Sequence, residues 1–71
     1  MSAIDDIGFE LADAALAEEK ASGDVKLVDR IADMLGASSQ SLEEAFLTGI
    51  RVRRAQVKAQ EMIAALSLIH I

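Results

Sequence analysis

Hydrophobic residues along the chain recur at intervals of three and four positions, which is the repeat of an amphipathic α-helix. Three such stretches can be separated, at residues 3–20, 25–35 and 41–66. Short polar segments that contain glycine or serine divide them. The pattern predicts an all-α protein with a small three-helix arrangement, in which a helical hairpin is followed by a long third helix.

Each predicted helix end has a signal in the sequence. Ser2 and Ser41 each precede an acidic residue by three positions, the spacing of a capping box at a helix start. Gly23 suits the left-handed conformation that ends a helix, and Asp24 suits the cap of the second helix. Gly36 is expected to end the second helix, so that residues 37–40 link it to the third.

The predicted third helix carries two apolar stripes. Larger side chains form one stripe, which we expect to face the chain's own core: Leu42, Phe46, Ile50, Val57 and Ala64. Mostly small side chains form the other, at alternating spacings of three and four: Ala45, Val52, Ala55, Ala59, Met62 and Leu66. Small residues let two helices approach closely, so this second stripe is predicted to bind a partner helix.

The third helix is also the longest, with about 26 residues and a length of about 39 Å at 1.5 Å per residue. It would overhang the other two unless it packs against both of them or against a second chain. Gly49 lies inside it, at a cost of about 1 kcal/mol relative to alanine. This glycine either admits a close contact or a slight bend, or is tolerated without a role.

The first predicted helix likewise has more apolar surface than one neighbour would cover. One face contains Ile4, Ile7, Leu11, Ala14 and Ala15, and a second, smaller patch contains Phe9, Ala12 and Leu16. A chain of 71 residues forms one domain and buries only about 60% of its unfolded surface. Association with another copy or another protein would therefore stabilise it.

Charge is distributed unevenly. The net charge is −5, but residues 1–24 hold seven acids and one base (−6), whereas residues 41–71 hold four bases and three acids (+1). This asymmetry favours an acidic first helix that lies beside the basic residues of the third. An acidic chain of this kind is not expected to bind nucleic acid through its overall field.

The densest basic cluster is at positions 51–58, where Arg51, Arg54 and Lys58 share one helix face and Arg53 lies beside them. These side chains can contact phosphates or an acidic partner. The interpretation we favour is that they are solvated or pair with acids of the first helix, namely Asp6, Glu10 and Asp13. The predicted partner-binding residues are therefore Ala45, Val52, Ala55, Ala59 and Met62 of the small-residue stripe, together with Arg51, Arg54 and Lys58.

Chemistry-bearing residues do not form a recognisable catalytic or metal-binding pattern. The adjacent carboxylates point about 100° apart on a helix, the four glycines are isolated, and there is no cysteine. We expect no enzymatic activity, no cofactor and no metal. The N-terminus lacks the basic and apolar regions of a signal peptide, so we expect a soluble cytoplasmic protein without membrane contact.

The last six residues differ from what precedes them, because polar interruptions stop and β-branched residues appear: Leu66-Ser67-Leu68-Ile69-His70-Ile71. They can be back-translated as CTG TCT CTT ATA CAC ATC, which resembles the transposon mosaic-end adapter of sequencing libraries. We therefore expect residues 1–65 to be the single helical domain and 66–71 to be a non-native tail from adapter read-through. The alternative is a genuine apolar tail, and His70 is assigned no role in either case.

Three functions remain open. The leading hypothesis is a non-enzymatic helical module for protein–protein interaction or oligomerisation. The second is an N-terminal helical fragment of a longer protein whose activity lies downstream, which reading the DNA past codon 65 would test. The third, a small nucleic-acid-associated regulator that uses the basic cluster, predicts binding that weakens steeply with salt.

Overall fold

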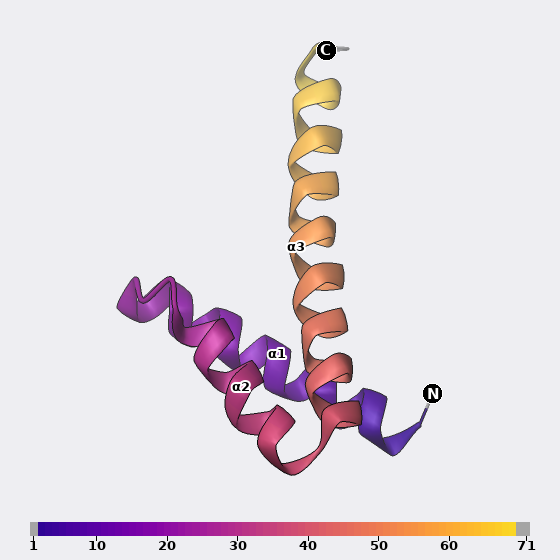
Figure 1. Cartoon of the computed structure of the whole chain (residues 1–71). Helices are drawn as coiled ribbons and strands as arrows, with labels where there is room; N and C mark the ends of the chain where they lie inside the picture. The colour runs from indigo at the N-terminus through magenta and orange to yellow at the C-terminus, as the bar shows by residue number, and fades with distance from the viewer. Residues whose placement is uncertain (1, 70–71) are drawn as a thin grey trace.

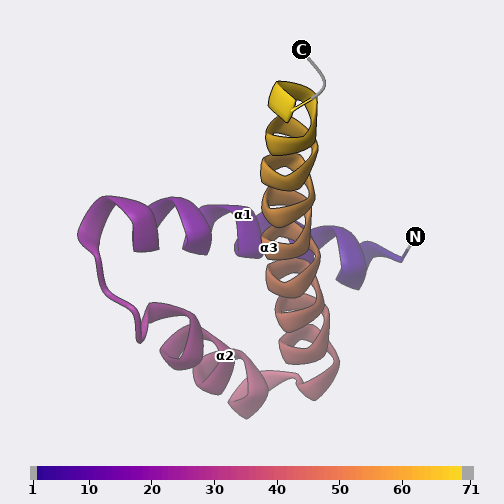
Figure 2. The ribbon, with the colours of Figure 1, turned by 90° about the horizontal axis from the view of Figure 1, so that it is seen from above.

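The computed structural model describes residues 2–69, which form three α-helices. These are α1 (Ala3–Ser22), α2 (Leu27–Ser38) and α3 (Gln40–Ile69). The predicted all-α, three-helix arrangement is confirmed. Helices α1 and α2 form a hairpin, and α3 projects from it at a steep angle (Figure 1). Seen from above, α3 crosses α1 (Figure 2).

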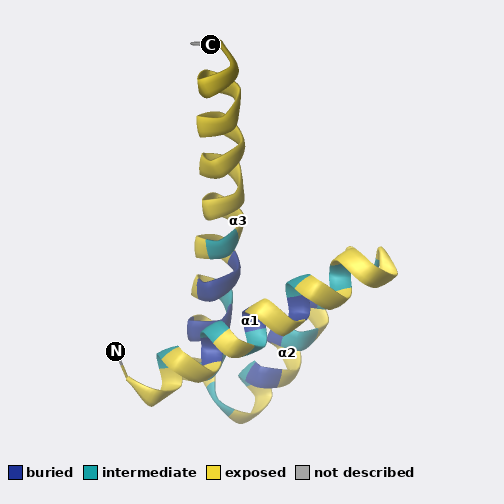
Figure 3. Cartoon of the chain, turned by 180° about the vertical axis from the view of Figure 1, so that it is seen from behind, coloured by how far each residue is buried: buried dark blue, intermediate teal, exposed yellow. Residues whose placement is uncertain are grey.

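The chain divides into two parts of different character. We call α1, α2 and residues 40–50 of α3 the head, and residues 51–69 of α3 the stalk. All buried residues of the described chain lie in the head, and every stalk residue is exposed except Arg53, which is half-buried (Figure 3). The predicted overhang of the third helix is therefore present, because the other two helices cover only its first part.

Overall dimensions reflect this division. The radius of gyration is 14.6 Å, whereas a compact chain of this length would have about 11 Å. The accessible surface is 5210 Å², against about 4300 Å² for a compact monomer of this mass. The molecule thus exposes about 900 Å² more surface than its size requires.

The core lies where the three helices meet and is entirely apolar. Phe46 is its largest member and has no exposed surface, and Ile50 is 3% exposed. The other helices contribute mostly small and branched side chains: Ala12 and Ala15 from α1, and Val28, Ala32 and Leu35 from α2. The predicted core-facing stripe is thus confirmed for Phe46 and Ile50, but Val57 is 50% exposed because the head ends before it.

Small residues set the crossing of α1 and α3. A Cβ placed on Gly8 would lie 2.7 Å from the carbonyl carbon of Ala45, and one placed on Gly49 would lie 2.9 Å from the Cβ of Ala12. Both distances are shorter than side chains tolerate, so the two backbones approach closely only because glycine is present. Of the alternatives for Gly49, the structure therefore supports the close contact.

The ends of α1 agree with the sequence signals. The Ser2 hydroxyl accepts a hydrogen bond from the backbone N–H of Asp5 at 3.2 Å. Gly23 ends the helix in the left-handed region, with φ 73°. Helix α2 begins later than predicted, at Leu27, because Asp24 accepts from the N–H of Lys26 at 3.0 Å and so forms a turn before the helix.

Two predictions about the link between α2 and α3 are wrong. The second helix does not end at Gly36 but continues to Ser38. The third helix is not capped by Ser41, because Ser39 accepts a hydrogen bond from the N–H of Leu42 at 3.1 Å and caps α3, which begins at Gln40. A single extended residue, Ser39 (φ −157°, ψ 109°), therefore separates the two helices.

Candidate interaction surface

The stalk presents apolar side chains to solvent along its whole length. Val52 is 44% exposed, Met62 66% and Ile63 64%. The large apolar residues exposed on the stalk are Val52, Val57, Met62, Ile63, Leu66, Leu68 and Ile69. Contiguous exposed apolar surface is uncommon on monomers and typically marks a site of interaction.

Most residues of the predicted partner-binding stripe lie together on the stalk. Val52, Ala55, Ala59 and Met62 are all exposed there. Ala45 is not part of this surface, because it is 7% exposed and lies against Gly8 in the crossing with α1. Ala45 lies seven residues before Val52 and therefore on the same side of the helix, so the spacing alone does not show where the covering helix ends.

The basic cluster is divided between intramolecular ion pairs and free charges. Arg53 Nε lies 2.8 Å from Asp13 Oδ1, and Arg54 Nη2 lies 3.1 Å from Glu19 Oε2. Of the three acids predicted as partners of the cluster, Asp13 is confirmed, whereas Asp6 and Glu10 form no ion pair within residues 2–69. The steep crossing carries α3 past the C-terminal half of α1, where Asp13 and Glu19 lie. The expected neighbourhood of acidic α1 and the basic part of α3 is present.

Arg53 is the residue that sequence reasoning undervalued. Besides its ion pair, its guanidinium carbon lies 5.3 Å from the centre of the Phe9 ring. A cation at that distance is attracted to the face of the ring. Arg53 therefore connects α3 to α1 at the boundary between the head and the stalk. Within residues 2–69, Arg51 and Lys58 form no ion pair and remain exposed.

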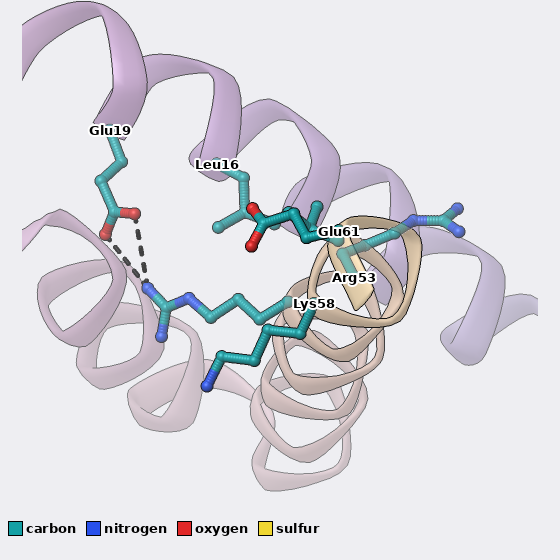
Figure 4. A pocket seen from close by; sticks show the side chains of 7 residues that line it. Leu16, Glu19, Arg53, Lys58 and Glu61 are labelled. Carbon is teal, nitrogen blue, oxygen red and sulfur yellow. Dashed lines mark hydrogen bonds and ion pairs between the residues drawn. The ribbon is translucent and has the colours of Figure 1, made fainter. Parts of the chain in front are cut away.

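A shallow groove lies between α1 and the base of the stalk. Its volume is about 390 Å³, and Figure 4 shows its charged rim, where Glu19 pairs with Arg54 and Lys58 extends into solvent. The lining residues are Leu16, Glu19, Arg53, Arg54, Val57, Lys58 and Glu61. An apolar floor with a charged rim is the usual make-up of a surface that receives another polypeptide.

Metal-binding clusters and membrane-spanning helices are absent from residues 2–69. Over residues 2–69 no three side chains of histidine, cysteine, aspartate or glutamate gather as metal ligands would. None of the described helices has the combination of length and apolar character needed to span a bilayer. His70 and Ile71, which belong to the predicted non-native tail, lie outside the described residues.

Comparison of the chain with protein-family models, curated proteins and solved structures finds no match. A function must therefore be inferred from the chain's own geometry. The stalk and the adjoining groove are the features from which to infer it, because they combine exposed apolar residues with two cations, Arg51 and Lys58, that form no ion pair within the described residues.

Proposed function

We propose that this protein is a non-enzymatic helical interaction module that uses the stalk to bind another α-helix. The observation that carries this proposal is the exposure of the stalk, a continuous helix from residue 51 to 69 on which no residue is buried. Most helical stability in proteins comes from the packing of an apolar face rather than from intrinsic propensity, and the stalk has no such packing among the described residues. A bound partner would supply that packing.

The amount of surface fits this role. The chain exposes about 900 Å² more than a compact monomer of its mass. A protein–protein interface of standard size buries about 800 Å² on each partner. The excess surface of one molecule is therefore close to what one partner contributes to a stable complex.

The composition of the stalk favours a polypeptide over nucleic acid. Ala55 and Ala59 lie in the middle of the exposed stripe, where small side chains allow a second helix to approach. The stalk has no aromatic residue on which a base could stack. Two of its four cations, Arg53 and Arg54, already pair with carboxylates of α1, which reduces the charge available to phosphates.

A carboxylate placed on the stripe tests this proposal. Ala59→Glu would put an unpaired charge into a helix–helix contact, whereas Gln60→Glu adds the same charge one residue away and serves as the control. Light scattering after size exclusion, over about 10 µM to 1 mM, should give a mass above the 7.6 kDa monomer. Only the first substitution should return it to the monomer.

Two outcomes would contradict the proposed binding of a helix by the stalk. A helical, fully monomeric wild-type protein at the highest concentration, with amide hydrogens of residues 52–65 exchanging as in an isolated peptide, would contradict the proposal. Loss of association by Gln60→Glu to the same extent would also contradict it, because the effect would then be one of net charge.

A further inference from the structure

We propose that the helix bound by the stalk is α1 of a second copy of this chain, in the antiparallel direction. This inference rests on the proposed function and names its partner. It starts from a second apolar stripe, on α1, that remains largely exposed. Ile4 is 43% exposed, Ile7 is 45% exposed and Ala14 is exposed, whereas Leu11 is half-buried because it packs in part against the core.

The two stripes have the same spacing. On α1 the positions are 4, 7, 11 and 14, and on the stalk they are 52, 55, 59 and 62. Each stripe therefore spans eleven residues, and its first and last members lie about 15 Å apart along the helix. Two helices with equal repeats of three and four residues can keep their stripes in contact over this whole length.

The sizes of the side chains are complementary as well. In an antiparallel pairing, Ile7 faces Ala59 of the other copy, and Leu11 faces its Ala55. At the ends, Ile4 faces Met62 and Ala14 faces Val52. Large residues opposite small ones give a close and evenly filled contact. The stalk's own stripe paired with itself would instead place alanines opposite alanines at its centre.

Within one chain the two stripes cannot meet. Gly8 and Ala12 of α1 already pack against α3, and Asp13 pairs with Arg53. Successive residues turn by about 100° around a helix. Ala55 and Ala59 therefore point away from the side of α3 on which Arg53 reaches α1. A second molecule is required to bring the stripes together.

Charge selects the same partner. Asp6 and Glu10 flank the stripe of α1 and form no ion pair within the described residues, while Arg51 and Lys58 flank the stripe of the stalk in the same way. In the antiparallel pairing the acidic flank of one helix lies along the basic flank of the other. Two stalks side by side would bring their cations together, which is unfavourable.

Each copy offers one stripe of each kind. A dimer in which both contacts form at once has two-fold symmetry and closes after two molecules. The structure thus accounts for why the acids are concentrated in residues 1–24 (−6) and the bases in the stalk, where four bases and one acid give +3. Opposite charge on the two surfaces would also speed their encounter.

Reciprocal charge reversal tests this pairing. The stalk variant carries Arg51→Glu and Lys58→Glu, and the α1 variant carries Asp6→Lys and Glu10→Lys. Each variant alone should raise the dimer dissociation constant at least tenfold in sedimentation equilibrium, because both of its contacts become repulsive. An equimolar mixture should form a heterodimer of wild-type affinity, because opposite charges then face each other in both contacts.

The matched control is Asp29→Lys with Asp33→Lys on the exposed face of α2. It changes the net charge by the same amount as the α1 variant. As in that variant, one of the replaced acids lies in the first turn of its helix and the other lies one turn later. It should leave the dissociation constant within about twofold. Helical content by circular dichroism, compared at equal concentration, shows whether each variant folds.

A covalent test does not depend on charge or on the folding of the reversed variants. The chain has no cysteine, so single substitutions give unambiguous disulfides. A mixture of Ile7→Cys and Ala59→Cys chains should form the mixed disulfide under mild oxidation, ahead of either symmetric one. Predominance of the Ala59→Cys homodimer instead would overturn the inference.

The outcomes separate this inference from the proposed function. If the stalk variant dissociates but the α1 variant associates like wild type, the stalk binds something other than α1, so the inference fails and the proposed function stands. A mixture that does not associate overturns the inference in the same way. A wild-type protein that is a monomer at every concentration overturns the inference. The proposed function fails with it if the amide hydrogens of residues 52–65 also exchange as in an isolated peptide.

Discussion

The two parts of α3 have a similar composition but opposite surroundings. Residues 40–50 contain five apolar side chains in eleven positions, and the stalk contains eleven in nineteen. The first part buries Ala45, Phe46, Gly49 and Ile50, whereas the stalk buries no residue. Apolar content therefore does not determine which residues of this helix are buried. Burial depends instead on how far α1 and α2 extend along α3.

Removing a large side chain from each part should give the sharpest contrast. Phe46→Ala creates a cavity at the centre of the head and should lower the free energy of unfolding by about 3–5 kcal/mol. Met62→Ala removes an exposed side chain from the stalk and should change it by less than about 0.5 kcal/mol at concentrations where the protein is monomeric. Urea unfolding followed by circular dichroism measures both. Equal losses would show that the stalk is packed as tightly as the head.

Filling the crossing of α1 and α3 should produce the next largest effect. The Cβ of Gly8→Ala would overlap the backbone of Ala45, which cannot move aside, so the free energy of unfolding should fall by about 1–3 kcal/mol. Gly36→Ala is the matched control. Its Cβ would meet only the end of the Glu43 side chain, at 2.6 Å from Oε1, and that end can rotate away. This control should stabilise the protein by about 0.5–1 kcal/mol, because alanine favours the helix.

The contact between Arg53 and α1 should contribute less. A double-mutant cycle with Asp13→Ala and Arg53→Ala should give a coupling energy of about 0.2–1 kcal/mol, since both side chains are partly exposed to solvent. The coupling should weaken in 1 M salt, where the Debye length falls to about 3 Å. Arg51→Ala provides the control, because Arg51 forms no ion pair within the described part of the chain. A coupling that is zero at low salt would show that the pair does not fasten α3 to α1.

Removing residues 66–71 should have the smallest effect on the head. Leu66, Leu68 and Ile69 are exposed and contribute nothing to the core. A chain that ends at Ala65 should therefore unfold with a free energy within about 0.5 kcal/mol of the full chain. Its dimerisation should also persist, because the proposed stripe ends at Met62. A larger loss of stability would indicate that these residues belong to the folded domain.

The sequence predicted the architecture well because its signals are local. Spacing and side-chain size together predict that the stripe with Phe46 and Ile50 faces the core, and Ser2 and Gly23 mark the ends of α1 as predicted. Gly36 was misassigned because glycine is compatible with a helix end but does not impose one. Ser39 supplied the cap instead.

The site was predicted less completely, because it depends on residues far apart in the chain. Ala45 belongs to the same stripe as Ala55 and Ala59. However, Ala45 is buried against Gly8, whereas Ala55 and Ala59 are exposed. Arg53 was placed at the edge of the basic strip, and its role depends on Asp13 and Phe9, which lie forty or more positions earlier. No periodic pattern within α3 contains that information.

The sequence by itself determined that this protein is helical, where its helices approximately lie, and which stripes on each helix are apolar. These properties follow from hydrophobic spacing and capping, which act over a few residues. Only the tertiary structure decided which stripe is covered. The crossing of α1 and α3 depends on how closely two distant backbones approach, and the length of the stalk depends on where two shorter helices end beside it.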